Sequence, residues 1–192
     1  EVANAYTQFG AAGISVLTDK VFFGGTLDDL SIAVKNPIPV LRKEFIIDEF
    51  QMIEAKAYGA SVILLIAACL NPSATNALAK FAKSLGLEVL LEIHDATELE
   101  HISDAVDFVG INNRSLKSFE VNIEHSLALK NQLPKGILSI AESGIYSLET
   151  FKLLKKEGFD GFLMGEYFMK QANPAEAFEA FVTSIKTEND AV

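Results

Sequence analysis

The sequence predicts an α/β protein of the TIM (β/α)8-barrel class, and three observations support this fold class. Seven short apolar runs recur at intervals of 20 to 29 residues, and a helical pattern follows each run. The runs are continuously apolar rather than alternating, as is typical of parallel strands buried on both faces. The spacing is nearly even and no glycine-rich fingerprint follows the first run, which favours a closed barrel over an open doubly wound sheet.

The expected strands are the seven apolar runs, most of which end in polar or charged residues. They cover residues 14–18, 39–43, 62–66, 88–92, 108–112, 137–142 and 161–165. The helices between them have recognisable start and stop residues. These are Asp48 and Gly59, Asn71-Pro72 and Gly86, and Ser147 and Gly158, with Asn173-Pro174 at the start of the last helix.

The number of expected strands is one short of a complete barrel. A barrel of this class has eight strands and commonly about 250 residues. This chain has seven expected strands in 192 residues, and the first of them begins at Ile14. Seven strands leave two unpaired edges where the barrel closes. We therefore expect one barrel domain over residues 1–192 that is incomplete at its N-terminus.

The net charge of the chain restricts which classes of molecule it is expected to bind. The net charge of −10 argues against nucleic acid, whose phosphates select basic surfaces, but permits a small phosphorylated ligand held by a few local donors. The sequence contains no run of 18 apolar residues, so no membrane span is predicted, and residues 1–4 do not resemble a signal peptide.

The single cysteine, Cys69, excludes a disulfide framework and favours a cytoplasmic location. Because it lies in an apolar run, we expect Cys69 to be buried rather than a nucleophile.

Polar residues at the ends of the expected strands are the candidates for catalysis, because barrels of this class carry their chemistry at the carboxyl ends of the strands. Lys43, Glu92, Asn112 and Glu142 each end one strand. A lysine and two glutamates at one mouth can separate their pKa values and act as general acids and bases. The alternative for each residue alone is a salt bridge at the end of its strand.

Two glycine-containing turns follow the last two expected strands, at residues 141–144 and 164–166. Barrels of this class frequently bind phosphate at this position. Glycine lets the backbone approach an anion, so that free N–H groups can point at it. The two turns together therefore favour a phosphate site.

Four segments resemble the indole-3-glycerol phosphate synthase family. Residues 39–48 read PVLRKEFIID and are similar to the family's PxLxKDFIID, and residues 110–116 read GINNRSL, similar to GINNRDL. Residues 141–145 read AESGI, similar to SESGI, and residues 14–19 read ISVLTD, which matches the end of AISVLTD. The motifs occur in the family's order and spacing, and the resemblance runs from Tyr6 to Ile185.

The resemblance implies an enzyme of tryptophan biosynthesis. The family closes the indole ring of 1-(2-carboxyphenylamino)-1-deoxyribulose 5-phosphate with loss of carbon dioxide and water, and it uses no cofactor. Lys43 matches the general acid that protonates the substrate carbonyl oxygen, and Glu92 matches the acid or base of the dehydration. Asn112 matches a residue that orients this network, and Glu142 matches a substrate-binding glutamate.

The resemblance also implies the binding residues. Arg114 matches a residue near the anthranilate end of the ligand, and Phe45 and Leu116 match apolar positions around its aromatic ring. Four residues fall where the family holds the phosphate: Ser143, Gly144, Gly165 and Glu166.

The chain departs from the family's pattern at three positions within or beside these motifs. Glu44 and Ser115 each stand where the family usually has Asp, and Glu166 stands where many members have Ser. We expect the Glu166 carboxylate to point away from the phosphate. The family's first strand brings a glutamate, a second catalytic lysine and a serine-rich phosphate loop, none of which can be assigned in this chain.

The remaining candidates have plainer interpretations. Asp95 is expected to cap a helix and His94 to lie at the surface, because no nucleophile is placed to use a His–Asp pair. The histidines lack the spacing of metal ligands, so no metal is expected. Phe22 and Phe23 are either packing at the barrel end or an apolar wall of the substrate mouth.

Two other functions stay open. One is another phosphosugar barrel such as phosphoribosylanthranilate isomerase, although that family usually relies on a Cys and an Asp. The other is an inactive ligand-binding barrel fragment. The family contains both single enzymes and fusions to other tryptophan-pathway enzymes, so the chain is expected to be a monomer or to be joined to such a partner.

Overall fold

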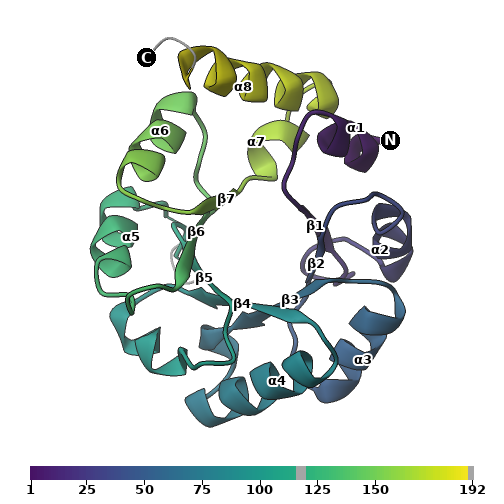
Figure 1. Ribbon diagram of the computed structural model, residues 1–192, viewed down its shortest axis with the longest axis vertical. Helices are drawn as coiled ribbons and strands as arrows, with labels where there is room; N and C mark the ends of the chain where they lie inside the picture. The colour runs from purple at the N-terminus through teal and green to yellow at the C-terminus, as the bar shows by residue number, and fades with distance from the viewer. Residues whose placement is uncertain (116–119, 190–192) are drawn as a thin grey trace.

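The computed structural model describes residues 1–115 and 120–189. Its seven strands are all parallel and pair in the order of the sequence. They are β1 (Ile14–Leu17), β2 (Val40–Lys43), β3 (Val62–Ile66), β4 (Glu88–Ile93), β5 (Phe108–Asn112), β6 (Leu138–Glu142) and β7 (Gly161–Leu163). The sheet curls around a central axis with the helices outside it (Figure 1). The predicted α/β barrel architecture and its seven strands are confirmed.

Helices connect successive strands on the outside of the curled sheet. Before β5 lie α1 (Val2–Gln8), α2 (Leu27–Ala33), α3 (Glu49–Ala57), η1 (Ala67–Cys69), α4 (Pro72–Ser84) and η2 (Ala96–His101). After β5 lie α5 (Ile123–Lys130), α6 (Leu148–Lys156), α7 (Glu166–Met169) and α8 (Pro174–Asn189). The expected caps are present, since Asp48, Asn71 and Ser147 each accept a backbone N–H of the following turn.

Two apolar layers hold the strands in place. On β3, Ile63 and Leu65 face outward and pack in the larger cluster between sheet and helices. Leu64 and Ile66 face inward and pack with Leu90 in a smaller cluster inside the curl. Both sides of the strand are therefore buried, which explains why the strands are continuously apolar. The inner cluster also forms the floor beneath the polar residues at the strand ends.

Strands β1 and β7 form the two edges of the sheet in the part of the chain that the structure describes. Figure 1 shows α1 beside α8 at this opening, with α7 between them and β7. The Tyr6 ring lies 4.6 Å from the Phe178 ring and 6.0 Å from the Phe168 ring. The first and last helices are thus joined by an aromatic contact although the two edge strands are not paired.

The prediction that Cys69 is buried is wrong. The structure places Cys69 in η1, just past the end of β3, with its side chain exposed. The apolar run 62–70 continues beyond the strand, but the chain turns outward after Ala67, which is buried.

Among the described residues, no helix is both long enough and apolar enough to cross a bilayer.

Candidate active site at the carboxyl ends of the strands

The pairing register of the strands brings the predicted polar residues together at one end of the barrel. Glu92 on β4 lies opposite Gly110 on β5, and Asn112 on β5 lies opposite Glu142 on β6. Lys43 is the last residue of β2. Because the strands are parallel and nearly in step, their carboxyl ends meet at the same rim. The expected convergence of these four residues is observed.

Lys43 bridges the two glutamates. Its Nζ donates to Glu92 Oε2 and to Glu142 Oε2, each at 3.2 Å. Asn112 Nδ2 donates to the other oxygen of Glu92, Oε1, at 3.0 Å. Only 4% of the Glu92 side chain and 1% of the Glu142 side chain are exposed, against 18% for Lys43. The ammonium is therefore the part of this triad that an incoming molecule can reach.

The environment separates the pKa values of the triad. Burial alone would lower the pKa of Lys43, but attraction to Glu142 and Glu92 outweighs it and raises that pKa. Burial raises the pKa of Glu142 to about 7, with repulsion from Glu92 assisting and Lys43 opposing. For Glu92, attraction to Lys43 and the Asn112 hydrogen bond outweigh burial and lower the pKa. The site thus combines a charged lysine, an ionised Glu92 and a Glu142 that can carry a proton near neutral pH.

Gly110 leaves room for the Glu142 carboxylate. A Cβ at position 110 would lie 1.8 Å from Glu142 Oε1 and 2.9 Å from Glu142 Cδ. Glu142 can therefore lie flat against β5 and reach Lys43 only because β5 has no side chain there. In the sequence, Gly110 is recognisable only as part of a family motif, and its role in making room for Glu142 was not predicted.

Substitution Gly110→Ala is expected to displace the Glu142 carboxylate and lower turnover by about 10²-fold, because misplacing a reacting group by about 1 Å has an effect of that size. Some loss of stability is also expected from overpacking, about 1–3 kcal/mol. Gly161→Ala is the matched control, since its Cβ would meet only the flexible end of Ile140. Steady-state assays and denaturant unfolding measure both effects. If Gly110→Ala turned over as fast as the parent, this would contradict the role of Gly110 in placing the Glu142 carboxylate.

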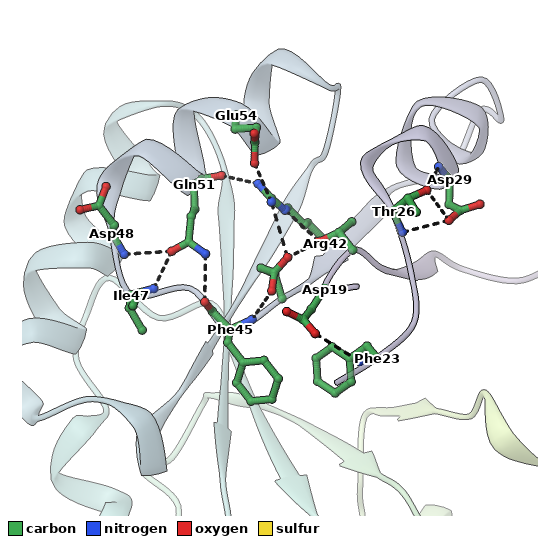
Figure 2. A network of polar contacts seen from close by, with 12 residues as sticks. Asp19, Phe23, Thr26, Asp29, Arg42, Phe45, Ile47, Asp48, Gln51 and Glu54 are labelled. Atoms are coloured by element: carbon green, nitrogen blue, oxygen red, sulfur yellow. Dashed lines mark hydrogen bonds and ion pairs between the residues drawn. The ribbon is translucent and has the colours of Figure 1, made fainter. Parts of the chain in front are cut away.

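A buried polar network supports β2 from behind (Figure 2). Arg42, only 3% exposed, donates to Thr18 Oγ1 at 3.0 Å, to the Gln51 carbonyl at 2.6 Å and to Glu54 at 2.7 Å. Thr18 in turn donates to Glu44 at 2.8 Å. Arg42 and Lys43 point to opposite sides of the strand, so the same strand end anchors α3 and presents the site lysine.

The same network holds the backbone of Phe45, the residue expected to pack against an aromatic ring. Glu44 Oε1 accepts the Phe45 N–H at 2.9 Å, and Gln51 Nε2 donates to the Phe45 carbonyl at 3.0 Å. The Phe45 ring stacks on Phe23, with centroids 4.7 Å apart, and meets Phe22 edge-on at 5.5 Å. Phe22 is 77% exposed, so these rings form an open apolar surface at the rim rather than closed packing at the barrel end.

Arg114 is held on the other side of the mouth. Its Nη2 lies 2.6 Å from Glu166 Oε2 and 2.5 Å from the Tyr146 hydroxyl, and Tyr146 also donates to Glu166. Lys170 contacts the remaining oxygen of Glu166. The Glu166 carboxylate is thus engaged by two cationic side chains and by the Tyr146 hydroxyl. Nothing in the sequence pattern indicated the part played by Tyr146.

The two turns expected to hold phosphate differ in shape. Ser143 and Gly144 both have left-handed backbone angles, with φ of 61° and 67°. The Ser143 carbonyl accepts Asn113 Nδ2 at 2.7 Å, so this strained turn is tied to β5. Gly165 has no atom within 4 Å of where a Cβ would lie, which leaves open space beside the second turn. Leu116, the other predicted apolar contact, lies outside the described residues.

The prediction that His94 lies at the surface is wrong, although Asp95 does cap η2 by accepting the Thr97 N–H. The His94 side chain is only 12% exposed. Its Nε2 lies 3.4 Å from Glu92 Oε1, and its Nδ1 lies 3.6 Å from Glu98 Oε2. His94 therefore borders the triad.

Solved structures with similar folds are barrels that share little sequence with this chain. A 3-hexulose-6-phosphate synthase superposes with a TM-score of 0.77 at 16% identity, covering 95% of this chain and 91% of that one. An orotidine 5'-phosphate decarboxylase from Pyrococcus horikoshii gives a TM-score of 0.73 at 16% identity, covering 96% and 91%. At this identity the likeness supports the fold alone.

Sequence comparison identifies the family. The family model described as indole-3-glycerol phosphate synthase matches residues 1–181. An indole-3-glycerol phosphate synthase of Bacteroides thetaiotaomicron is 46% identical over 189 residues, covering 97% of this chain and 72% of the relative. One of Nautilia profundicola is 46% identical over 179 residues, covering 92% and 69%. The chain therefore belongs to the indole-3-glycerol phosphate synthase family.

Proposed function

We propose that this protein converts 1-(2-carboxyphenylamino)-1-deoxyribulose 5-phosphate to indole-3-glycerol phosphate. The observation that carries the proposal is the buried Lys43–Glu92–Glu142 triad at the mouth of a barrel of this family, with Lys43 3.2 Å from each glutamate. The reaction needs proton donors and acceptors of different strength at adjacent points, and the separated pKa values of the triad supply them.

The first step is formation of the new carbon–carbon bond. The ring carbon that bears the carboxylate attacks the ketone carbon, and the ketone oxygen takes a proton from the Lys43 ammonium. Loss of carbon dioxide then returns the bonding electrons to the ring and restores its aromaticity. Glu142, whose pKa of about 7 lets it hold a proton at neutral pH, returns a proton to Lys43.

The second step is dehydration. The hydroxyl group formed from the ketone takes a proton from the recharged Lys43 ammonium and leaves as water, and the carbon beside the nitrogen loses a proton. Glu92 is the proposed acceptor of that proton, because its lowered pKa keeps it ionised. Asn112 binds the Glu92 oxygen that Lys43 does not contact, so it is proposed to orient the carboxylate.

The proposed binding groups surround the triad. Phe45 packs against the substrate's aromatic ring, together with Leu116, and Arg114 binds near the anthranilate end. The turns with Ser143 and Gly144, and with Gly165 and Glu166, hold the phosphate through backbone N–H groups. At Glu166 the backbone is the proposed contact, because the carboxylate is engaged by Arg114, Tyr146 and Lys170.

The surroundings of the enzyme are proposed on the family resemblance. We infer a cytoplasmic enzyme that acts on a small phosphorylated molecule, as a monomer or joined to another tryptophan-pathway enzyme. Light scattering after gel filtration measures the oligomeric state.

Turnover of the carboxyphenylamino substrate, followed by the fluorescence of the indole product, tests the proposal. The parent is expected to be active, and Glu92→Gln is expected to lower kcat by about 10²–10⁴-fold, because a positioned acid or base contributes that much. Glu88→Gln is the matched control, since Glu88 is exposed at the opposite end of the same strand. A parent that stays inactive after a first-strand segment is restored would refute the function, and an active Glu92→Gln would refute the role of Glu92.

A further inference from the structure

His94 lies beside the triad without belonging to it. It follows the last residue of β4 and is 12% exposed. One ring nitrogen, Nε2, lies 3.4 Å from Glu92 Oε1, and the other, Nδ1, lies 3.6 Å from Glu98 Oε2. Neither nitrogen has an aligned hydrogen-bond partner among the described residues. The ring therefore lies between two carboxylates, each within 4 Å of one of its nitrogens.

Contacts with η2 and α5 hold the backbone that carries this ring. The His94 N–H donates to Glu98 Oε2 at 2.6 Å, which ties the end of β4 to η2. The His94 carbonyl lies 2.8 Å from His125 Nε2 on α5. Asp95 caps η2 directly after the ring. A histidine held in this way can act at a defined distance from its neighbours.

The charged groups around His94 favour its protonated form. Burial lowers the pKa of His94, but the Glu98 carboxylate and then Glu92 outweigh it, with Glu142 on β6 adding to the effect, so the pKa rises above its ordinary value. Lys43 faces Glu92 from the opposite side, on Oε2. Helix α5 contributes one titratable side chain to these surroundings among the described residues, His125, whose Nε2 contacts the His94 carbonyl oxygen.

We propose that His94 is a positioning residue for Glu92: its imidazolium, held between Glu92 and Glu98, orients the Glu92 carboxylate and sets the pH at which that carboxylate takes up a proton. The two oxygens of Glu92 then have distinct partners, with Lys43 on Oε2 and both Asn112 and His94 at Oε1. The inference rests on the proposed role of Glu92 as the base of dehydration.

The test is the pH profile of kcat and kcat/KM for the carboxyphenylamino substrate. Without the imidazolium, Glu92 binds its proton more readily, so His94→Gln is expected to move the acidic limb to higher pH by about one unit. At pH values below the midpoint of the acidic limb, the rate of His94→Gln would then be up to about tenfold lower than the rate of the parent. His101→Gln is the matched control, because His101 is a buried histidine at the end of η2 whose ring bonds Thr75 and not a residue of the triad. It is expected to leave the midpoint unchanged.

A second variant keeps the test decisive if His94→Gln does not fold. Glu98→Gln leaves the imidazole in place and can still accept the His94 N–H, but it removes one of the charges that keep the ring protonated. It is expected to move the acidic limb in the same direction by less, and the double variant should match His94→Gln. A midpoint unmoved in His94→Gln, or in Glu98→Gln when the first variant is unfolded, would overturn the proposal. So would an equal shift in His101→Gln.

These outcomes are separable from failure of the proposed function. A Glu92→Gln variant as active as the parent removes the base on which His94 is proposed to act and overturns both proposals. So does a parent that stays inactive after a first-strand segment is restored. An active parent, an impaired Glu92→Gln and an unmoved His94→Gln profile overturn the role of His94 alone.

Discussion

Replacing Lys43 with Met is expected to lower kcat by about 10²–10⁴-fold, because it removes the proposed proton donor to the ketone oxygen while keeping a side chain of similar length. KM should change much less, since the phosphate and aromatic ends of the substrate bind elsewhere. The loss is expected at every pH from 6 to about 9, because the raised pKa keeps Lys43 charged throughout this range. Steady-state kinetics with the carboxyphenylamino substrate measures both parameters.

Lys83→Met is the matched control for this substitution. Lys83 also forms an ion pair, with Asp107 at 2.7 Å, but it lies on α4 outside the triad. It is expected to keep the parent's kcat. A Lys43→Met protein that retains kcat would refute Lys43 as the proton donor, whatever its stability.

Replacing Glu142 with Gln should change both turnover and the pH dependence of stability. Turnover is expected to fall by about 10²-fold or more, because Gln cannot return a proton to Lys43. The stability effect follows from the raised pKa of Glu142, about 7 in the folded protein against an ordinary 4.5. Between these values the folded carboxyl binds a proton that the unfolded one has released, so this group's contribution to stability is lost as pH rises through that window.

The stability effect is measured by comparing the parent and Glu142→Gln in denaturant at several pH values. Gln does not titrate, so the variant should gain stability relative to the parent as pH rises from about 4.5 to 7, and the difference should be constant outside this range. Glu88→Gln, at an exposed position, is expected to show no such gain. Stability curves for parent and Glu142→Gln that stay parallel across the window would contradict the raised pKa of Glu142.

The convergence of the site could be predicted because it follows from topology. Lys43, Glu92, Asn112 and Glu142 are the last or nearly the last residues of their strands, and parallel strands in step bring such residues to one rim. The sequence pattern contains this information directly, as strand length and spacing. It does not contain the distances, which depend on the direction of each side chain.

The residues that prediction missed act through contacts between segments far apart in the chain. Gly110 matters because Glu142, 32 positions later, lies flat on it, and Tyr146 matters because it joins Arg114 to Glu166. His94 was expected at the surface because no nucleophile is placed to use a His–Asp pair. Glu98 binds its backbone and keeps the ring beside Glu92. No local pattern reports such contacts.

Hydrophobic periodicity and helix caps are local properties of the chain, so the barrel class, the seven strands and the residues at their carboxyl ends could be predicted from the sequence. Which side chains meet, and which protonation states they hold, is defined only in the folded molecule. The pKa values of Glu92 and Glu142 move in opposite directions although both glutamates end buried strands. Burial and charge at a given atom depend on every segment packed around it, and these become defined only when the strands are assembled.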